Sequence, residues 1–394
     1  MKILYHHRIA SKDGQYVHVE EMLKALRGLG HKVIVVGPKV AEEEEFGSEG
    51  GWVAKLRDRL PKSIYEFLEF GYSAVAYLQL RKAVLAHRPD CIYERYNLFL
   101  PAGVWISKRF NLPMLSEVNA PLFEERSRFG GIANKRLAGW SESYVWNNAD
   151  KVLPVTEVLA GHVRNTGVAD DKIQVIHNGI DPDKFAALDD KHSAKQHLGL
   201  EGTEVLGFTG FVRDWHGLDL VLELICQPGF ENTSLLLVGD GPARPQLEQQ
   251  AKKLGVAERF KVTGIVSRDE LSKYLSAFDI ALQPAAVAYA SPLKLFEYMM
   301  IDAAIIAPRQ DNILEVLSDG KNALLFDPES RTDFRDKLAV LFGDRKLRAR
   351  LCASARNTVF EDGYTGQSNG KRVEALFRDL LAQNLASNPS ASIT

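Results

Sequence analysis

The stretch from Ser291 to Glu297 combines residue types that suit phosphate and sugar binding. It follows an apolar run and predicts a helix start, with Ser291 as the cap and Pro292 at the first helical position. Lys294 then falls in the first turn, where a cation meets the positive end of the helix dipole unless an anion lies between them. Glu297 lies one turn later on the same face, where its carboxylate accepts hydrogen bonds from hydroxyls.

The backbone of the same helix start offers further donors to an anion. The N–H groups of Leu293, Lys294 and Leu295 have no carbonyl partner within a helix that begins here, and they point toward the same position. With Glu297 they predict a site for a ligand that carries both a phosphate and a diol. The spacing alone also fits an ordinary surface helix with a Lys/Glu pair, so other parts of the chain must decide.

A charged loop at residues 210–217 follows a predicted strand and offers two more phosphate ligands. The guanidinium fork of Arg213 matches phosphate oxygens, and His216 supplies an additional donor. A plain surface role for Arg213 is the alternative.

Two glycine-containing loops also follow predicted strands, and they carry Gly239 and the pair Gly264 and Val266. The first is not a dinucleotide fingerprint, because Arg244 occupies the place of the third glycine. The C-terminal ends of parallel strands meet at one edge of a sheet, so we expect these loops, the 210–217 loop and the helix start to line one donor-binding site.

Strand-like and helix-like segments alternate along the chain, which is typical of doubly wound α/β domains. The length of 394 residues favours two of them. We predict a first domain over residues 1–180, a linker to about 195, a second domain over 195–360 and a helix over 371–385 that packs across the junction. The expected strands are 2–6, 32–36, 91–94, 114–118, 151–155, 172–176, 204–209, 234–238, 260–263, 279–282, 303–307 and 323–326.

Gly14 lies in the loop after the first expected strand, at the ligand-binding end of the first sheet. Glycine there lets the backbone approach a ligand closely, or it serves only a turn.

Composition narrows the partners and the compartment. The 49 basic and 51 acidic residues give no general attraction to nucleic acid, and the three cysteines are widely spaced, as in a reducing compartment. The N-terminus predicts a strand rather than a signal peptide, so we expect a cytoplasmic protein. No zinc-type motif occurs, and Asp181-Pro182-Asp183 fits a turn and helix cap better than a metal clamp.

Residues 51–86 mix apolar side chains with basic ones, among them Arg57, Arg59 and Lys62. Such a segment fits helices packed on the sheet with a charged outer face. It also fits peripheral contact with an anionic membrane surface, on the inner face of the membrane if the protein is cytoplasmic.

Five motifs, in order along nearly the whole chain, resemble the family 4 retaining glycosyltransferases of the GT-B fold. They are Asp13-Gly14-Gln15, Gly30-His31-Lys32-Val33, Asn178-Gly179-Ile180-Asp181, Val238-Gly239-Asp240-Gly241-Pro242 and Ser291-Pro292-Leu293-Lys294-Leu295-Phe296-Glu297-Tyr298-Met299. The last one indicates a Ser-Pro-Leu-Lys-Leu-Phe-Glu subgroup. The resemblance implies two Rossmann-like domains facing across a cleft, a nucleoside-diphosphate sugar held mainly by the second, no metal, and a C-terminal helix that returns to the first domain.

The resemblance also implies roles for residues of the second domain. Glu297 matches the second glutamate of the family's Glu-x7-Glu motif, which binds the donor ribose, while the first glutamate is replaced by Tyr289. The family's diphosphate-binding lysine and arginine fall at His216 and Phe211. Arg213 and Lys294 are therefore expected to supply the missing charge to the departing diphosphate.

In the first domain, the segment from Ser116 to Pro121 resembles one in which many relatives place a histidine beside the donor sugar. Ser116 occupies that position here, so Glu117 and Asn119 become candidates for sugar or acceptor contacts. A buried structural role for Glu117 is the alternative.

The function implied is transfer of a hexose-type sugar from a UDP- or GDP-sugar to an acceptor hydroxyl with retention, in bacterial polysaccharide or glycolipid synthesis. The donor is a substrate, and no cofactor is expected. The acceptor is a glycan or a lipid-linked glycan. A GT-B nucleotide-sugar epimerase and a non-catalytic sugar-nucleotide-binding scaffold are the alternatives, the latter suggested by Tyr289 and Phe211.

Overall fold

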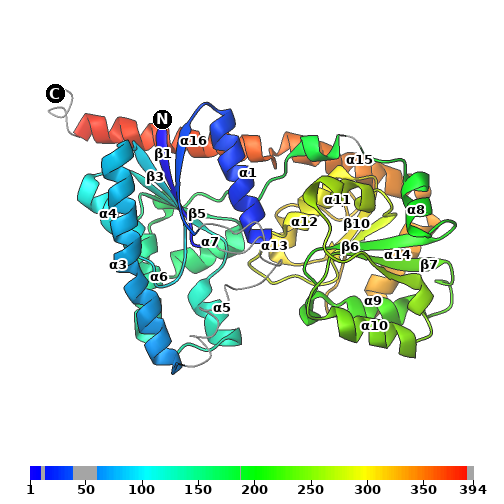
Figure 1. Ribbon diagram of the computed structural model, residues 1–394. Coiled ribbons are helices and arrows are strands. Elements are labelled where there is room, and N and C mark those ends of the chain that lie inside the picture. Colours follow the sequence, from blue (N-terminus) through cyan, green and yellow to red (C-terminus); the bar gives the residue numbers. More distant parts are fainter. Residues whose placement is uncertain (10–13, 39–59, 187, 388–394) are drawn as a thin grey trace. The chain divides into compact units, whose positions relative to one another are not determined.

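The chain, seen in a computed structural model, forms two compact units (Figure 1). Unit 1 comprises Met1–His177, Tyr289–Ser291 and Gly366–Thr394, and unit 2 comprises Asn178–Ala288 and Pro292–Thr365. The structure describes residues 1–9, 14–38, 60–186 and 188–387. Each unit is described by itself.

Unit 1 is built on a five-stranded parallel sheet in the order β2-β1-β3-β4-β5. Its strands are β1 (Lys2–His6), β2 (Lys32–Val36), β3 (Cys91–Arg95), β4 (Met114–Val118) and β5 (Lys151–Pro154). Its helices are α1 (Gly14–Gly28), α3 (Lys62–His87), α4 (Ala102–Phe110), α5 (Leu122–Phe129), α6 (Lys135–Asn148), α7 (Glu157–Arg164) and α16 (Gly366–Ser387).

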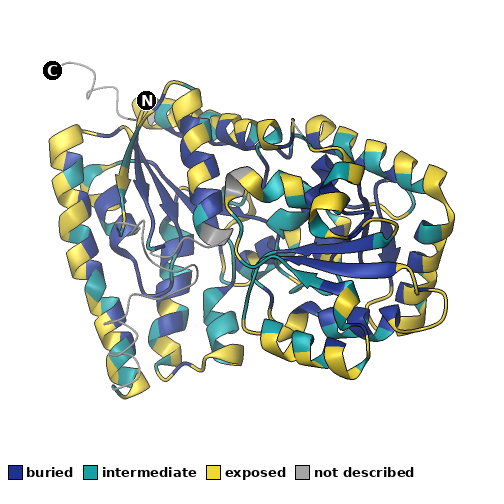
Figure 2. Cartoon of the chain, turned by 45° about the vertical axis from the view of Figure 1, so that its right-hand side comes forward, coloured by how far each residue is buried: buried dark blue, intermediate teal, exposed yellow. Residues whose placement is uncertain are grey.

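Helices cover both faces of this sheet, so β3 and β4 are buried along their whole length. Alternate strand residues enter two cores: Ile3 and Tyr5 pack with α1 and α16, while Leu4 packs with α3, α4 and α6. On the first face, Val373 and Phe377 of α16 are fully buried. The dark blue sheet between partly yellow helices in Figure 2 shows this layering.

Unit 2 repeats the pattern with a six-stranded parallel sheet in the order β11-β10-β9-β6-β7-β8. Its strands are β6 (Glu204–Thr209), β7 (Thr233–Val238), β8 (Phe260–Val262), β9 (Ile280–Leu282), β10 (Ala304–Pro308) and β11 (Leu324–Phe326). Its helices are α8 (Lys191–Leu198), α9 (Leu218–Ile225), α10 (Arg244–Lys253), α11 (Arg268–Leu275), α12 (Leu293–Met300), α13 (Asp311–Leu314), α14 (Arg331–Gly343) and α15 (Arg345–Glu361).

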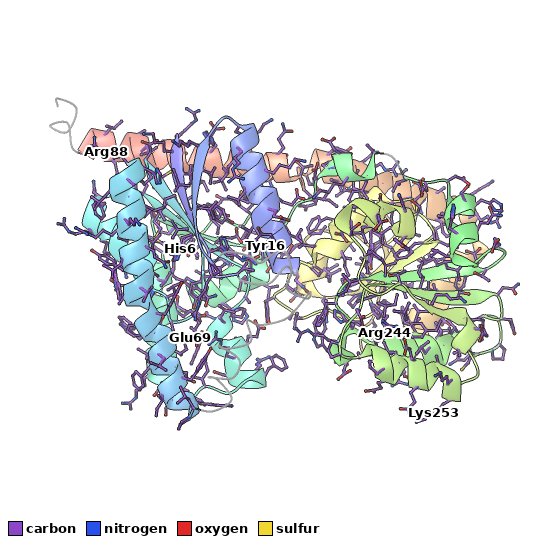
Figure 3. The ribbon with its side chains drawn as sticks, viewed as in Figure 1. His6, Tyr16, Glu69, Arg88, Arg244 and Lys253 are labelled. Carbon is purple, nitrogen blue, oxygen red and sulfur yellow. The ribbon has the colours of Figure 1, made fainter. Side chains whose placement is uncertain are left out.

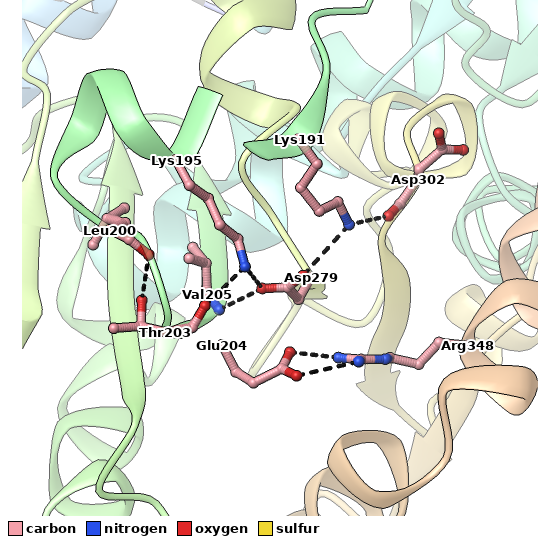
Figure 4. A network of polar contacts seen from close by, with 9 residues as sticks. All are labelled: Lys191, Lys195, Leu200, Thr203, Glu204, Val205, Asp279, Asp302 and Arg348. Atoms are coloured by element: carbon pink, nitrogen blue, oxygen red, sulfur yellow. Dashed lines mark hydrogen bonds and ion pairs between the residues drawn. The ribbon is translucent and has the colours of Figure 1, made fainter. Parts of the chain in front are cut away.

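Ion pairs tie helices to the N-terminal ends of the unit 2 strands (Figure 4). Asp279, just before β9, accepts hydrogen bonds from Lys195 of α8 at 2.5 Å and from the amide of Val205 at 2.7 Å. Glu204 of β6 pairs with Arg348 of α15 at 2.6 Å. These contacts anchor the sheet at the end opposite to the loops that follow the strands.

The predicted two-sheet α/β architecture is confirmed, and most strand boundaries agree within one residue. The strand expected at 172–176 is wrong. A 3-10 helix covers Asp170–Lys172, and a single bridge from Ile173 to Val152 replaces a ladder. The cap and turn expected at Asp181 is confirmed, because its side chain accepts a hydrogen bond from the amide of Asp183.

Of the helices that the structure describes, none is long and apolar enough to cross a lipid bilayer. Arg57, Arg59 and the loop residue Asp13 lie outside the described residues. Lys62 is the first residue of α3.

Candidate active site

The loops that follow β6, β7 and β8 lie side by side in unit 2. The amide of Gly210 donates to the carbonyl of Val238 at 3.0 Å, and that of Val212 donates to Asp240 at 2.8 Å. The third loop joins them where Gly239 bridges Gly264. Adjacent strands thus bring together the three loops that carry the predicted donor-binding residues.

Gly239 allows this close approach. Its φ of 138° lies where residues with a Cβ are strained, and a Cβ added there would lie 2.2 Å from the carbonyl oxygen of Gly210. The backbone of the second loop therefore passes close to the first only because position 239 has no side chain.

His216 is a neutral hydrogen-bond donor at the end of the first loop. Its Nδ1 accepts the amide of Arg213 at 2.9 Å, so the ring proton is on Nε2. Burial, and then the charge of Lys294, lowers the pKa of His216 to about 3. Its ring stacks on Trp215 at 3.8 Å between centroids.

Lys294, in the first turn of α12, has its ammonium 3.7 Å from the centroid of the Phe208 ring, at the end of β6. A Cβ on Gly210 would lie 3.5 Å from the same nitrogen. Burial lowers the pKa of Lys294 to about 7, while the charge of Glu297 acts in the opposite direction. Burial thus disfavours the charged form of Lys294, and an anion bound beside it would stabilise that form.

The start of α12 differs from the prediction in two respects. Pro292 occupies the cap position without a side-chain cap bond, so the expected cap at Ser291 is wrong. Ser291 is buried and belongs to unit 1 with Tyr289. The amide of Leu295 donates to Pro292 at 3.0 Å and is therefore not one of the free donors, whereas Leu293 starts the helix.

The helix α12 is fixed to β6 by the buried hydroxyl of Tyr298, which accepts the amide of Thr209 at 2.9 Å. Glu297, the preceding residue, is half-buried. Arg213 is exposed, with its guanidinium 5.4 Å from the centroid of the Phe211 ring. Lys294 and His216 lie together because both contact the ring of Phe208, whereas the exposed Arg213 can reorient toward a ligand.

The other predicted donor-binding residues lie on two units. Gly264 has a φ of 72° and lies near the start of the third loop, with half-buried Val266 two residues later in unit 2. Gly14 is the first residue of α1 in unit 1.

Glu117, on β4 of unit 1, is the centre of a buried ionic cluster. Tyr93 donates to its Oε2 at 2.6 Å, and Oε1 pairs with Arg95 and with His18 of α1 at 3.1 Å. Burial opposes its ionisation, but the charges of His18 and Arg95 outweigh burial and hold the pKa of Glu117 well below its usual range. With only 3% of its surface exposed, Glu117 is saturated by the protein itself.

Asn119 and Ser116 differ in access. Asn119 is half-buried and donates to Glu117, so its amide is oriented by the cluster. Ser116 is fully buried inside the sheet. Asn119 is therefore the better placed of the two for a ligand.

A second buried pair lies on the neighbouring strands, where His6 at the end of β1 meets Glu94 of β3 at 2.6 Å (Figure 3 labels His6). Glu94 approaches Gly103 in the first turn of α4 so closely that a Cβ there would lie 1.9 Å from its carboxylate. The helix dipole favours a carboxylate in this position.

Sequence reasoning missed His18, Arg95 and Tyr93 as members of the unit 1 cluster. One signal was available, because Tyr93-Glu94-Arg95 places two charges inside a buried strand, which demands partners. The partners themselves lie far away in sequence and carry no local signature. Among the described residues, no group of three or more His, Cys, Asp or Glu side chains is arranged to hold a metal ion.

Comparison with family models matches both units. Residues 12–184 match the model described as Glycosyltransferase Family 4, and residues 190–358 match Glycosyl transferases group 1. The chain belongs to glycosyltransferase family 4. The family resemblance drawn from the five motifs is thereby confirmed, whereas the Ser-Pro-Leu-Lys-Leu-Phe-Glu subgroup stays a prediction.

Curated relatives of the family are similar at modest identity. A 2-deoxystreptamine glucosyltransferase of Streptomyces kanamyceticus is 35% identical over 36% of this chain and 39% of its own length. A D-inositol 3-phosphate glycosyltransferase of Streptomyces bingchenggensis is 23% identical over 71% of the chain and 65% of its own length. The matches thus span less than two thirds of these relatives.

Solved structures show the same fold. HepE of Anabaena, in complex with UDP-glucose, superposes with a TM-score of 0.73 at 18% identity, over 98% of this chain and 100% of that one. WaaG, a glycosyltransferase involved in lipopolysaccharide biosynthesis, superposes with a TM-score of 0.69 at 15% identity, over 96% and 99%. The predicted GT-B fold is confirmed.

Proposed function

We propose that the protein transfers a hexose-type sugar from a UDP- or GDP-sugar to an acceptor hydroxyl with retention of configuration. The observation that carries the proposal is the position of Lys294, at the start of α12 and beside Gly210 of the first strand-end loop. Burial lowers the pKa of Lys294, so the charged form of this side chain is best stabilised by a ligand that brings negative charge. The bound UDP-glucose of HepE supports a nucleotide-sugar donor.

Each donor-site residue has a role in this proposal. Lys294 and Arg213 neutralise the charge that develops on the departing diphosphate, and His216 donates a hydrogen bond from Nε2 without adding charge. Glu297 accepts hydrogen bonds from the ribose hydroxyls. The leaving phosphate itself can take the acceptor proton, so we assign no general base.

The donor also meets the backbone of unit 2. Gly239 and Gly264 have no side chains, so a nucleotide can approach the backbone of their loops closely. Val266 contacts the base, and Leu293 donates its amide to a phosphate. Gly14 of unit 1 has no side chain and lets the backbone there approach the donor phosphates closely.

Unit 1 supplies the acceptor side of the proposal. Asn119 contacts the sugar or the acceptor, and Glu117 acts through it by fixing Asn119, Arg95 and His18 in place. The acceptor is a glycan or a lipid-linked glycan, and the reaction belongs to bacterial polysaccharide or glycolipid synthesis. A cytoplasmic protein in peripheral contact with the inner face of the membrane fits this role.

Glu297→Ala tests the proposal directly. Loss of two hydrogen bonds to the ribose should weaken donor binding by about a hundredfold or more, because each hydrogen bond to a charged group contributes about 1.5–3 kcal/mol. Titration calorimetry with UDP, UDP-sugars and GDP-sugars measures the affinity, and Glu258→Ala, exposed before β8, is the control. Full donor affinity and full transfer in Glu297→Ala would refute the assignment.

A further inference from the structure

The helix α3 of unit 1 has an inverted distribution of side chains. Its two acidic residues, Glu66 and Glu69, are buried at 6% exposure each. Large apolar side chains lie on its outer side instead, at spacings of three, four and seven residues that form one stripe: Ile64 48%, Phe67 59%, Leu68 51%, Val75 47%, Leu78 62% and Leu85 55% exposed. In Figure 2 much of the outer side of this helix is yellow.

The buried carboxylates fix the orientation of the helix. Glu66 accepts the amides of Ala133 and Asn134 at 2.8 and 2.7 Å, and Glu69 forms a two-bond pair with Arg126 at 2.8 and 2.9 Å. Turning the stripe inward would break these bonds and leave buried charges without partners, at high cost. The exposed stripe is therefore a stable feature of unit 1.

A groove continues the stripe onto α4, which packs beside α3 (Figure 1). It has a volume of about 550 Å³ and is lined by Ala74, Tyr77, Leu78, Trp105, Lys108 and Arg109. Trp105 lies edge-on to Tyr77 with ring centroids 6.5 Å apart. Aromatic rings with a polar edge, next to basic side chains, are typical of surfaces that sit at the boundary between lipid tails and headgroups.

The charges around this face have one sign. From Lys62 to His87 and from Ala102 to Phe110, every exposed charged side chain is basic: Lys62, Arg81, Lys82, Lys108 and Arg109. The whole chain, by contrast, has 49 basic and 51 acidic residues. The basic charge is therefore concentrated locally where the apolar stripe is exposed.

We propose that the stripe and groove of α3 and α4 dock on a membrane surface that contains anionic phospholipid. Apolar side chains enter the boundary region while the lysines and arginines meet phosphate headgroups, so the surface chemistry is complementary on both counts. A second copy of the chain fits less well, because two such faces would bring Arg81 and Lys82 against their own equivalents. The biological sense of the docking rests on the proposed function, since it brings the transferase to a lipid-linked acceptor.

Vesicle sedimentation tests the docking without donor or acceptor. The protein should sediment with vesicles of equimolar phosphatidylcholine and phosphatidylglycerol, less with phosphatidylcholine alone, and less at high salt. Lys108→Glu/Arg109→Glu should lower binding to the anionic vesicles by about tenfold or more. Phe67→Ser/Leu68→Ser should lower binding to a similar extent by removing the inserted side chains.

Matched controls exist in unit 2. Lys252→Glu/Lys253→Glu on α10 reverses an exposed lysine pair, and Phe360→Ser removes an aromatic side chain that is 55% exposed. Both should bind vesicles as the unchanged protein does. All four changes affect exposed side chains, so thermal unfolding should stay close to that of the parent.

Three outcomes would overturn the docking. The first is that the unchanged protein does not sediment with vesicles, and the second is that the α3 and α4 variants bind vesicles as well as the unchanged protein does. The third is that the protein binds no vesicles but forms a dimer that Phe67→Ser/Leu68→Ser dissociates. The last result would assign the face to a second copy. UDP affinity, measured in parallel, separates the two proposals. Failure of vesicle binding with intact UDP binding removes only the docking, and the converse removes only the donor site.

Discussion

Lys294 is an amine whose charged and neutral forms are close to balance at neutral pH. Its pKa of about 7 arises from burial, and a diphosphate beside it would raise that pKa again. Above pH 7 the protein must therefore take up a proton to bind the donor. Proton uptake makes binding depend on pH in a range where UDP itself stays ionised.

We expect UDP affinity to fall as the pH rises above 7, by as much as about tenfold per pH unit, because one proton is bound with the ligand. Titration calorimetry in buffers of different ionisation enthalpy measures both affinity and proton uptake. Lys294→Met should bind weakly at pH 7 and lose this dependence, while exposed Lys252→Met should behave like the parent. A flat affinity in the parent above pH 7 would contradict the role of Lys294.

Glu117 is a second single residue with a measurable effect, in this case on the free energy of unfolding. Glu117→Gln leaves Arg95 and His18 buried without a compensating charge, which should cost about 3–5 kcal/mol of unfolding free energy. Urea unfolding at pH 7 measures this loss, and Glu157→Gln, whose side chain is 59% exposed, should change stability by less than about 0.5 kcal/mol. Equal stabilities of the two variants would show that the cluster is not an ionic anchor.

The pH dependence of the same group has a defined sign. The pKa of Glu117 is lowered in the folded protein, so its contribution is present above the ordinary value of 4.5 and is lost as the pH falls below that value toward the folded pKa. In Glu117→Gln this part of the acid sensitivity should be missing.

At the scale of elements, the strand-end loops of unit 2 depend on one position. Gly239→Ala would place a Cβ 2.2 Å from the carbonyl oxygen of Gly210 and force the first two loops apart. We expect UDP binding to be lost and stability to fall by more than the roughly 1–2 kcal/mol of backbone strain alone.

Gly229→Ala is the matched control for this change, since Gly229 also has a positive φ, 92°, but nothing lies within 4 Å of an added Cβ. It should cost the backbone strain and leave UDP binding intact. Thermal unfolding with and without UDP compares the two variants. Similar UDP stabilisation in both would mean that the spacing of the loops does not govern the donor site.

Elements with local signals were the ones that could be predicted from sequence. The strands at 2–6, 32–36, 114–118 and 204–209 agree with the structure residue by residue, because apolar runs between turn formers are local features. The segment 172–176 has the same β-like composition, but it pairs with β5 only through the bridge from Ile173 to Val152 and hydrogen bonds from Gln174 and Ile176, and the extent of pairing is a tertiary property.

The candidate site divides in the same way. Lys294, Glu297 and the glycine loops follow from residue type and spacing, and the sheet order places those loops together. The partners of Glu117, by contrast, come from β3 and α1, and such long-range pairs leave no periodic trace. The sequence predicts the mixture of basic and apolar side chains in α3. It does not predict that the two glutamates of this helix are buried, because their partners are distant in sequence.

At the scale of the whole molecule, each unit has its own core, so each should respond to its own core substitution. Phe377→Ala, in α16, should destabilise unit 1 by about 3–5 kcal/mol and leave UDP protection of unit 2 amides unchanged. Leu338 is fully buried in α14 of unit 2. Leu338→Ala should therefore destabilise unit 2 by about 2–5 kcal/mol and leave the protection of unit 1 amides unchanged. Hydrogen exchange resolved by peptide measures the units separately, and equal loss of protection in both units for either variant would contradict their independence.

The placement of α16 has a consequence for synthesis on the ribosome. Unit 1 begins at Met1, yet the buried face of α1 and β1 is covered by Val373, Phe377 and Leu380, which are translated after all of unit 2. Domains fold as units during translation, usually from the N-terminus. Here the order is reversed in part: unit 2 can complete its core first, while the apolar face of α1 and β1 stays exposed until α16 is translated, and such exposed apolar surface makes a folding intermediate prone to aggregate.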